Sequence, residues 1–138
     1  MKRLSILIAI FIAATTFYNC NKSLKSNTHI ISPKETQTLL QNHNVQLIDI
    51  RTPKEFKTGH IENAQNIDFL SLDFSEEIKK LNKKQPVIIY CRSGRRSALS
   101  TTKFLDAGFT EIYDLQGGII KWKKQGFKIQ NHPKSSRK

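Results

Sequence analysis

Short apolar runs along the chain alternate with segments of helical periodicity. The apolar runs predict four strands, at 45–50, 64–67, 87–90 and 111–115. Helices are predicted around them, at 32–42, 52–59, 72–81, 95–106 and 117–122. Strands that alternate with helices favour an α/β fold with a mostly parallel sheet.

Two of the predicted helices start in the same way, at Ser32-Pro33-Lys34-Glu35 and at Thr52-Pro53-Lys54-Glu55. Each start has a capping hydroxyl, a proline at the first helical position and a glutamate three residues after the cap. The strongest strand, 87–90, follows Pro86, and Gly108 closes the helix after it.

The first 19 residues have the pattern of an export signal. A basic start precedes residues 4–17, which are apolar apart from one serine and two threonines. This stretch is short for a membrane span, which takes about 20 residues, but it has the length of a signal-peptide core. Followed by Cys20, it resembles a bacterial lipoprotein signal. That resemblance implies a lipid on Cys20 and a position on the periplasmic side of a bacterial membrane.

The bulky residues 17–19 depart from the small residues usual before a lipidated cysteine. Cleavage near Ala13-Ala14 and an uncleaved anchor therefore remain alternatives, and each of them also exports the domain. With 138 residues, the chain suits one domain after such a signal. The predicted divisions are a signal peptide at 1–19, a linker at 20–28, a folded domain at 29–127 and a basic tail at 128–138.

The net charge is +12 and the pI is about 9.9, which favours anionic partners. The lysines lie in scattered pairs, and no basic and aromatic residues interleave, so no nucleic-acid partner is expected. The two cysteines and four histidines are too dispersed for a metal site, and no cofactor is expected. With a lipid on Cys20, Cys91 would be the only free thiol, so its chemistry must pass to another molecule.

A loop rich in arginine joins strand 87–90 to helix 95–106. Ligands of open α/β sheets bind at this edge of the sheet, and N–H groups of a loop that enters a helix form an anion-binding nest. Such a setting favours a thiolate, so Cys91 is the predicted catalytic residue. The predicted substrate-binding residues follow it: Arg92, Ser93, Gly94, Arg95 and Arg96. The alternative is an inert cysteine that ends a core strand.

The run 91–97 resembles the active-site loop of the rhodanese-type sulfurtransferases. Two further segments share the resemblance: Asp49-Ile50-Arg51 with Glu55-Phe56 and Gly59-His60-Ile61-Glu62-Asn63-Ala64, and Leu115-Gln116-Gly117-Gly118-Ile119 with Trp122. The resemblance covers about residues 29–127 and implies a single-domain rhodanese. The implied fold is α/β, with a central, mostly parallel sheet of about five strands and helices on both faces.

The resemblance also implies a chemistry. The Cys91 thiolate would take the outer sulfur of thiosulfate or a related small anionic donor and release sulfite. The resulting persulfide, held by N–H groups of residues 92–96, would pass sulfur to cyanide or a thiol acceptor. Arg92, Arg95 and Arg96 would attract the donor or simply supply a positive field.

Other functions of this fold fit less well. Phosphatases have five residues between the cysteine and an arginine, and that arginine position is Ser97 here; they also usually have histidine where Tyr90 stands. A non-enzymatic binding module would have lost the loop cysteine, which is present. A periplasmic carrier that receives persulfide or redox equivalents from a partner stays open.

Several residues are predicted to support the site. Asp49 and Arg51 are either a surface ion pair of little value or, as in the family, a brace near the active-site edge. Ser97 is expected to assist at the end of the loop, and Glu55 to cap its helix. His60 is expected to be structural and hydrogen-bonded, Gly117-Gly118 to form a tight turn, and Trp122 to anchor the core.

Overall fold

The structure is a computed structural model that describes residues 27–42 and 44–131. The predicted signal peptide, Cys20 and residues 132–138 of the predicted tail lie outside these residues. Within the described part of the chain, no helix combines the length and the apolar character needed to cross a bilayer.

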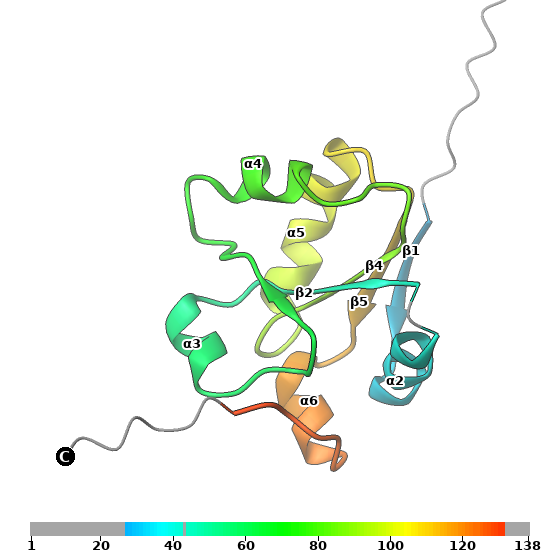
Figure 1. Cartoon of the computed structure of the whole chain (residues 1–138), viewed down its shortest axis with the longest axis vertical. Helices are drawn as coiled ribbons and strands as arrows, with labels where there is room; N and C mark the ends of the chain where they lie inside the picture. Colours follow the sequence, from blue (N-terminus) through cyan, green and yellow to red (C-terminus); the bar gives the residue numbers. More distant parts are fainter. Residues whose placement is uncertain (1–26, 43, 132–138) are drawn as a thin grey trace, which may run out of the picture.

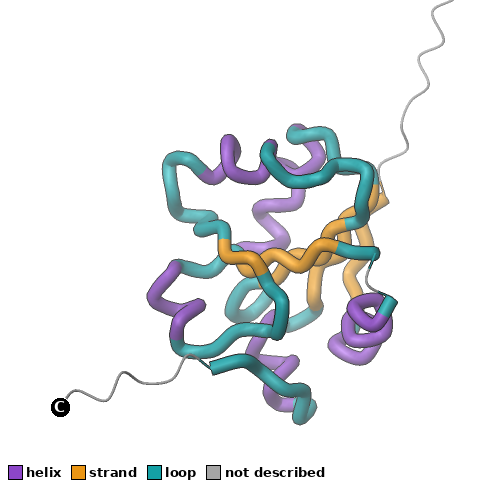
Figure 2. The backbone as a smooth tube through the Cα atoms, viewed as in Figure 1, coloured by secondary structure: helices purple, strands orange, loops and turns teal. Residues whose placement is uncertain are grey.

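One sheet of five parallel strands lies at the centre of the domain (Figures 1 and 2). The strands are β1 (Asn27–Ile31), β2 (Gln46–Asp49), β3 (Gln65–Asn66), β4 (Val87–Tyr90) and β5 (Glu111–Leu115). Their order is β1-β5-β4-β2-β3, and every pairing between them is parallel. This arrangement confirms the predicted sheet and places β4 between two neighbours.

The apolar pattern did not predict β1. Its first four residues are exposed and Ile31 alone is buried, because the strand lies at the edge of the sheet beside β5. An exposed edge strand needs no apolar alternation, so its sequence gives little signal. The strand begins at Asn27, and the predicted linker 20–28 therefore runs two residues into the sheet.

Five helices are described: α2 (Pro33–Gln41), α3 (Pro53–Lys57), α4 (Phe74–Lys79), α5 (Arg95–Asp106) and α6 (Gly118–Lys124). Both predicted capping boxes are present, at Ser32 with Glu35 and at Thr52 with Glu55. The prediction for 72–81 is wrong at its start, because the Phe74 N–H donates to the Ser71 carbonyl in a turn. Leu72 lies in that turn, fully exposed and outside the helix.

Helices cover both faces of the sheet, as predicted (Figure 1). Because strand side chains alternate between faces, Val87 and Ile89 pack in the cluster beneath α4 and α5. Ile88 and Tyr90 pack in the other cluster, with α2 and α6. The strand that leads to the predicted catalytic cysteine is therefore buried on both sides and held rigidly.

The chain after α6 returns to the domain. The Trp122 indole N–H donates to the Lys128 carbonyl at 2.9 Å, and Trp122 is buried, as predicted for a core anchor. Gln130 then forms an antiparallel bridge with His60, through two backbone hydrogen bonds of 3.0 and 2.7 Å. The folded domain therefore extends past the predicted limit of residue 127, and the first residues of the predicted basic tail belong to it.

Candidate active site

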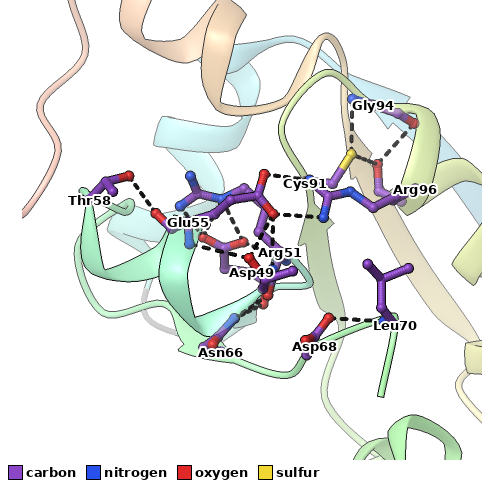
Figure 3. A network of polar contacts seen from close by, with 12 residues as sticks. Asp49, Arg51, Glu55, Thr58, Asn66, Asp68, Leu70, Cys91, Gly94 and Arg96 are labelled. Carbon is purple, nitrogen blue, oxygen red and sulfur yellow. Dashed lines mark hydrogen bonds and ion pairs between the residues drawn. The ribbon is translucent and has the colours of Figure 1, made fainter. Parts of the chain in front are cut away.

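Cys91 directly follows β4, where the chain curls into α5. Its side chain is only 1% exposed. The Gly94 N–H donates to the Cys91 Sγ at 3.1 Å (Figure 3). The Ser97 hydroxyl lies 3.7 Å from the same sulfur. Gly94 has a φ of 94°, a left-handed conformation that glycine adopts without steric cost. The loop thus turns back on the sulfur and donates hydrogen bonds to it.

The start of α6 braces the back of this loop. The carbonyls of Cys91 and Arg92 accept hydrogen bonds from Ile119 and Ile120, at 3.0 and 3.1 Å. In a trans peptide the N–H points opposite to the C=O, so the N–H groups of Arg92 and Ser93 point away from α6. Neither has an acceptor among the described residues. These two donors are available to an anion.

Close backbone contact makes this brace possible. Gly118 has a φ of 57°, and a Cβ there would lie 2.7 Å from the carbonyl carbon and oxygen of Arg92. Gly117-Gly118, predicted to be a tight turn, is therefore also the point at which α6 touches the Cys91 loop.

The three arginines of the loop differ in their surroundings. Arg92 and Arg95 are exposed. Arg96 forms a bidentate ion pair with Glu55 on α3, with N–O distances of 2.8 and 2.7 Å (Figure 3). This pairing is the main reason why the pKa of Glu55 falls to about 2. Glu55 thus does more than cap α3, and Arg96, predicted either to attract the donor or to supply a positive field, has its charge paired with Glu55.

Asp49 and Arg51 form a buried pair, so their interpretation as a surface pair is wrong. The side chains are 0% and 5% exposed, and the Asp49 Oδ2 lies 2.5 Å from the Arg51 Nη2. The same nitrogen donates to the Gly59 carbonyl at 2.8 Å. Asn66 donates to the carbonyls of both Asp49 and Arg51. The pair therefore ties β2, β3 and the end of α3 together beside the site.

The family model for the rhodanese-like domain matches residues 32–125. The chain belongs to the rhodanese-like domain family.

Three known proteins illustrate the relationship. The chain is 36% identical over 107 residues to the "tRNA uridine(34) hydroxylase" of Chlamydia felis, covering 73% of this chain and 33% of that protein. It is 36% identical over 96 residues to the "Probable adenylyltransferase/sulfurtransferase MoeZ" of Mycobacterium tuberculosis, covering 69% and 24%. The rhodanese-like domain thus spans a third or less of the length of these relatives.

A solved structure matches over more of its length. The polysulfide-sulfur transferase homodimer of Wolinella succinogenes superposes with a TM-score of 0.65 at 28% identity. The match covers 90% of this chain and 93% of that one.

His60 of the rhodanese-like domain is structural, as predicted. Its ring is stacked on Phe56 at 3.8 Å between centroids, and its Nδ1 lies 3.2 Å from the Phe56 carbonyl oxygen. Tyr90 stands where a phosphatase usually has histidine. Its hydroxyl accepts the Ile61 N–H at 3.1 Å, and burial raises the pKa of Tyr90 above its ordinary value.

Ser97 contacts the sulfur. A second buried polar residue, Asp114 on β5, was not indicated by the sequence, and burial raises its pKa above the ordinary value. The sequence of the strand Glu111–Leu115 does not indicate that this aspartate is buried, because burial depends on packing against other elements of the chain. In residues 27–42 and 44–131, no three His, Cys, Asp or Glu side chains are grouped to hold a metal.

Proposed function

We propose that the protein is a sulfurtransferase that moves sulfane sulfur through a Cys91 persulfide. The observation that carries the proposal is the Cys91 sulfur itself, which accepts the Gly94 N–H at 3.1 Å inside a loop with two further unpaired N–H groups. N–H groups that converge in a loop ahead of a helix stabilise anions. A thiolate and a persulfide are both anions that such donors stabilise.

The reaction has two balanced steps. The Cys91 thiolate attacks the outer sulfur of thiosulfate, the bond between the two donor sulfurs breaks, and sulfite leaves with the electron pair. The acceptor, cyanide or a thiolate, then attacks the outer sulfur of the persulfide. The Cys91 thiolate leaves with the electron pair of that bond and is regenerated.

The charges around the loop suit an anionic donor. Arg92 and Arg95 are exposed at its rim, where they attract a dianion. Arg96 is neutralised by Glu55 and serves mainly to hold the loop against α3.

The comparisons support sulfur transfer more than phosphate chemistry. One relative is named as a probable adenylyltransferase/sulfurtransferase, and one of the matching solved structures is a polysulfide-sulfur transferase. Where a phosphatase would place its arginine, this chain has the buried Ser97, whose hydroxyl lies 3.7 Å from the Cys91 sulfur.

We also propose that the protein is exported and carried on the periplasmic side of a bacterial membrane by a lipid on Cys20. The support is the sequence of residues 1–20 alone. Labelled fatty acid on the full chain, absent from a Cys20→Ser variant, tests this part independently of the chemistry.

The test of sulfur transfer is a thiosulfate:cyanide assay of the full chain and of Cys91→Ser. We expect thiocyanate from the wild-type protein only. Equal activity of the two proteins would refute the proposal. Activity with a protein persulfide as donor and none with thiosulfate would identify the carrier function instead.

A further inference from the structure

Cationic side chains line the edge of the sheet at which Cys91 lies, and they extend beyond the Cys91 loop. Because all the strands are parallel, the residues that follow them lie along one edge. In the order of the strands across the sheet, Lys34 follows β1, Lys121 follows β5, Arg92 and Arg95 follow β4, and Lys54 follows β2. The Lys121 amine donates to the side chain of Gln116, the residue directly after β5, so this charge also lies at the edge. We call these residues, Lys34, Lys54, Arg92, Arg95 and Lys121, the cationic edge.

The charges of the cationic edge are not balanced by neighbouring carboxylates. Lys121 is half-buried and the others are exposed, and none of them forms an ion pair within residues 27–42 and 44–131. The two nearby glutamates are engaged elsewhere, because Glu35 caps α2 and Glu55 holds Arg96. At the opposite end of the domain, by contrast, the lysines at the end of α4 pair with glutamates of the same helix (Figure 1). The unpaired positive charge is therefore concentrated around Cys91.

The cationic edge is longer than a small sulfur donor needs. From β1 to β2 the sheet spans three strand spacings, which is about 14 Å. A donor held at the Cys91 loop meets Arg92 and Arg95, whereas Lys34 and Lys54 belong to α2 and α3. An anionic partner that uses the whole edge must have a surface of macromolecular size.

The chemistry of Cys91 determines which macromolecule fits. Cys91 is the one cysteine of the described residues, so no neighbouring thiol takes its sulfur. The acceptor must bring a nucleophile to the loop. Phospholipids and nucleic acids offer phosphate charge without a thiol, and a membrane against this edge would cover the loop. A protein with acidic residues around a cysteine offers both the charge and the nucleophile.

We propose that the sulfur acceptor is an acidic protein with an exposed thiol, and that it docks on the cationic edge. Its thiolate attacks the outer sulfur of the Cys91 persulfide, the bond between the two sulfurs breaks, and the Cys91 thiolate leaves with the electron pair. The partner leaves as a persulfide, so the step needs no oxidant. Carboxylates around the partner's thiol pair with the cationic edge, which speeds the encounter and orients the two sulfurs. The inference rests on the proposed function for the direction of sulfur transfer, whereas the docking is tested without it.

The test measures docking by disulfide exchange. The probe is a peptide with one cysteine between two runs of three glutamates, activated as its mixed disulfide with thionitrobenzoate. Three extended residues span about 10 Å, or two strand spacings, so each run reaches along the edge. The Cys91 thiolate of the full chain attacks the peptide sulfur and releases coloured thionitrobenzoate. Cys91→Ser supplies the blank, which also removes any reaction at Cys20.

The glutamate peptide should react faster than the same peptide with glutamines. After each rate is divided by the rate of that peptide with β-mercaptoethanol, we expect a preference of about tenfold or more at low ionic strength. The preference should disappear in about 0.5 M salt, where charges are screened beyond a few ångströms.

Two variants reverse charges of the cationic edge that lie outside the Cys91 loop. Lys34→Glu and Lys54→Glu should each slow the glutamate peptide by about two- to fivefold and leave the glutamine peptide unchanged. Lys84→Glu is the matched control, because Lys84 is an exposed lysine shortly before β4, at the other end of the strand that leads to Cys91. It should leave both rates near their wild-type values.

Three results would overturn the docking. The two peptides could react at equal normalised rates, or Lys34→Glu and Lys54→Glu could slow the glutamate peptide no more than Lys84→Glu does. The latter result would confine the anion site to the loop arginines. Loss of Cys91 reactivity on phosphatidylglycerol vesicles, with no preference for the glutamate peptide, would assign the edge to a membrane instead. A failure of the proposed function is seen separately, as equal thiocyanate production by the wild type and Cys91→Ser.

Discussion

Two arginine–carboxylate pairs lie beside the Cys91 loop, and they differ in burial and in the distance along the sequence between their partners. Asp49 and Arg51 are two residues apart and almost fully buried. Glu55 and Arg96 are 41 residues apart, and their side chains remain 30% and 22% exposed. The first pair holds the scaffold, whereas the second ties the loop to α3.

Burial determines what each pair does. Removing one partner of a buried pair leaves an uncompensated charge and costs about 3 to 5 kcal/mol. A pair in contact with solvent contributes about 1 kcal/mol or less. The Asp49–Arg51 pair should therefore control stability, and the Glu55–Arg96 pair should control how the site meets its donor.

Arg51→Met tests the buried pair and should have the largest effect. We expect the free energy of unfolding to fall by about 3 to 5 kcal/mol, because Asp49 is left charged and buried. Urea denaturation followed by circular dichroism measures this loss. Arg92→Met, the same change at an exposed position, should cost no more than about 0.5 kcal/mol. A loss below about 1 kcal/mol in Arg51→Met would remove the contrast between the pairs.

Gly118→Ala tests the backbone brace, the second restraint on the loop. The added methyl meets the Arg92 carbonyl at a φ of 57°. We expect a loss of about 2 to 4 kcal/mol and a fall in kcat/KM for thiosulfate of about tenfold or more. Gly126→Ala is the control, since its φ is 80° and a Cβ there has nothing within 4 Å. It should lose some stability but keep its activity, and equal activity of the two variants would argue against the brace.

Glu55→Gln tests the exposed pair. It leaves the charge of Arg96 uncompensated beside the loop, so the KM for thiosulfate should fall by about two- to fivefold, which corresponds to less than about 1 kcal/mol. Glu62→Gln makes the same change in net charge at another exposed position, outside α3 and the Cys91 loop, and its KM should stay near the wild-type value. An increase in KM for Glu55→Gln would mean that the ion pair itself shapes the donor site.

The same pair predicts a small acid-dependent effect. The pKa of Glu55 is lowered to about 2 in the folded protein, from an ordinary value of 4.5. Its contribution is therefore complete above pH 4.5 and is lost as the pH falls towards about 2. After allowance for solvent screening it amounts to about 1 kcal/mol. The difference in unfolding free energy between wild type and Glu55→Gln should shrink over this range, whereas a constant difference would contradict the assignment.

Features that depend on residues close together in the chain were predictable from the sequence. The capping boxes at Ser32 and Thr52 are visible because their partners lie three residues away. The limits of α5 and the placing of Cys91 at the end of β4 follow from an apolar strand and a helix start that are adjacent in the chain.

Long-range contacts were not predictable in the same way. No spacing rule connects Glu55 with Arg96, or Gln130 with His60. Asp114 lies in a strand that also contains Glu111 and Tyr113, so the strand's sequence does not indicate that Asp114 is buried. Its burial follows from the packing of the folded domain. The edge strand β1 gave no apolar signal because four of its five residues face solvent.

The central claim is that the Cys91 sulfur carries the transferred sulfur. Mass spectrometry of the full chain after incubation with thiosulfate tests it most directly, with peptide mapping to locate the change. We predict a gain of one sulfur atom on Cys91, removed by cyanide and absent from Cys91→Ser. An unmodified Cys91 in a protein that still produces thiocyanate would contradict the claim.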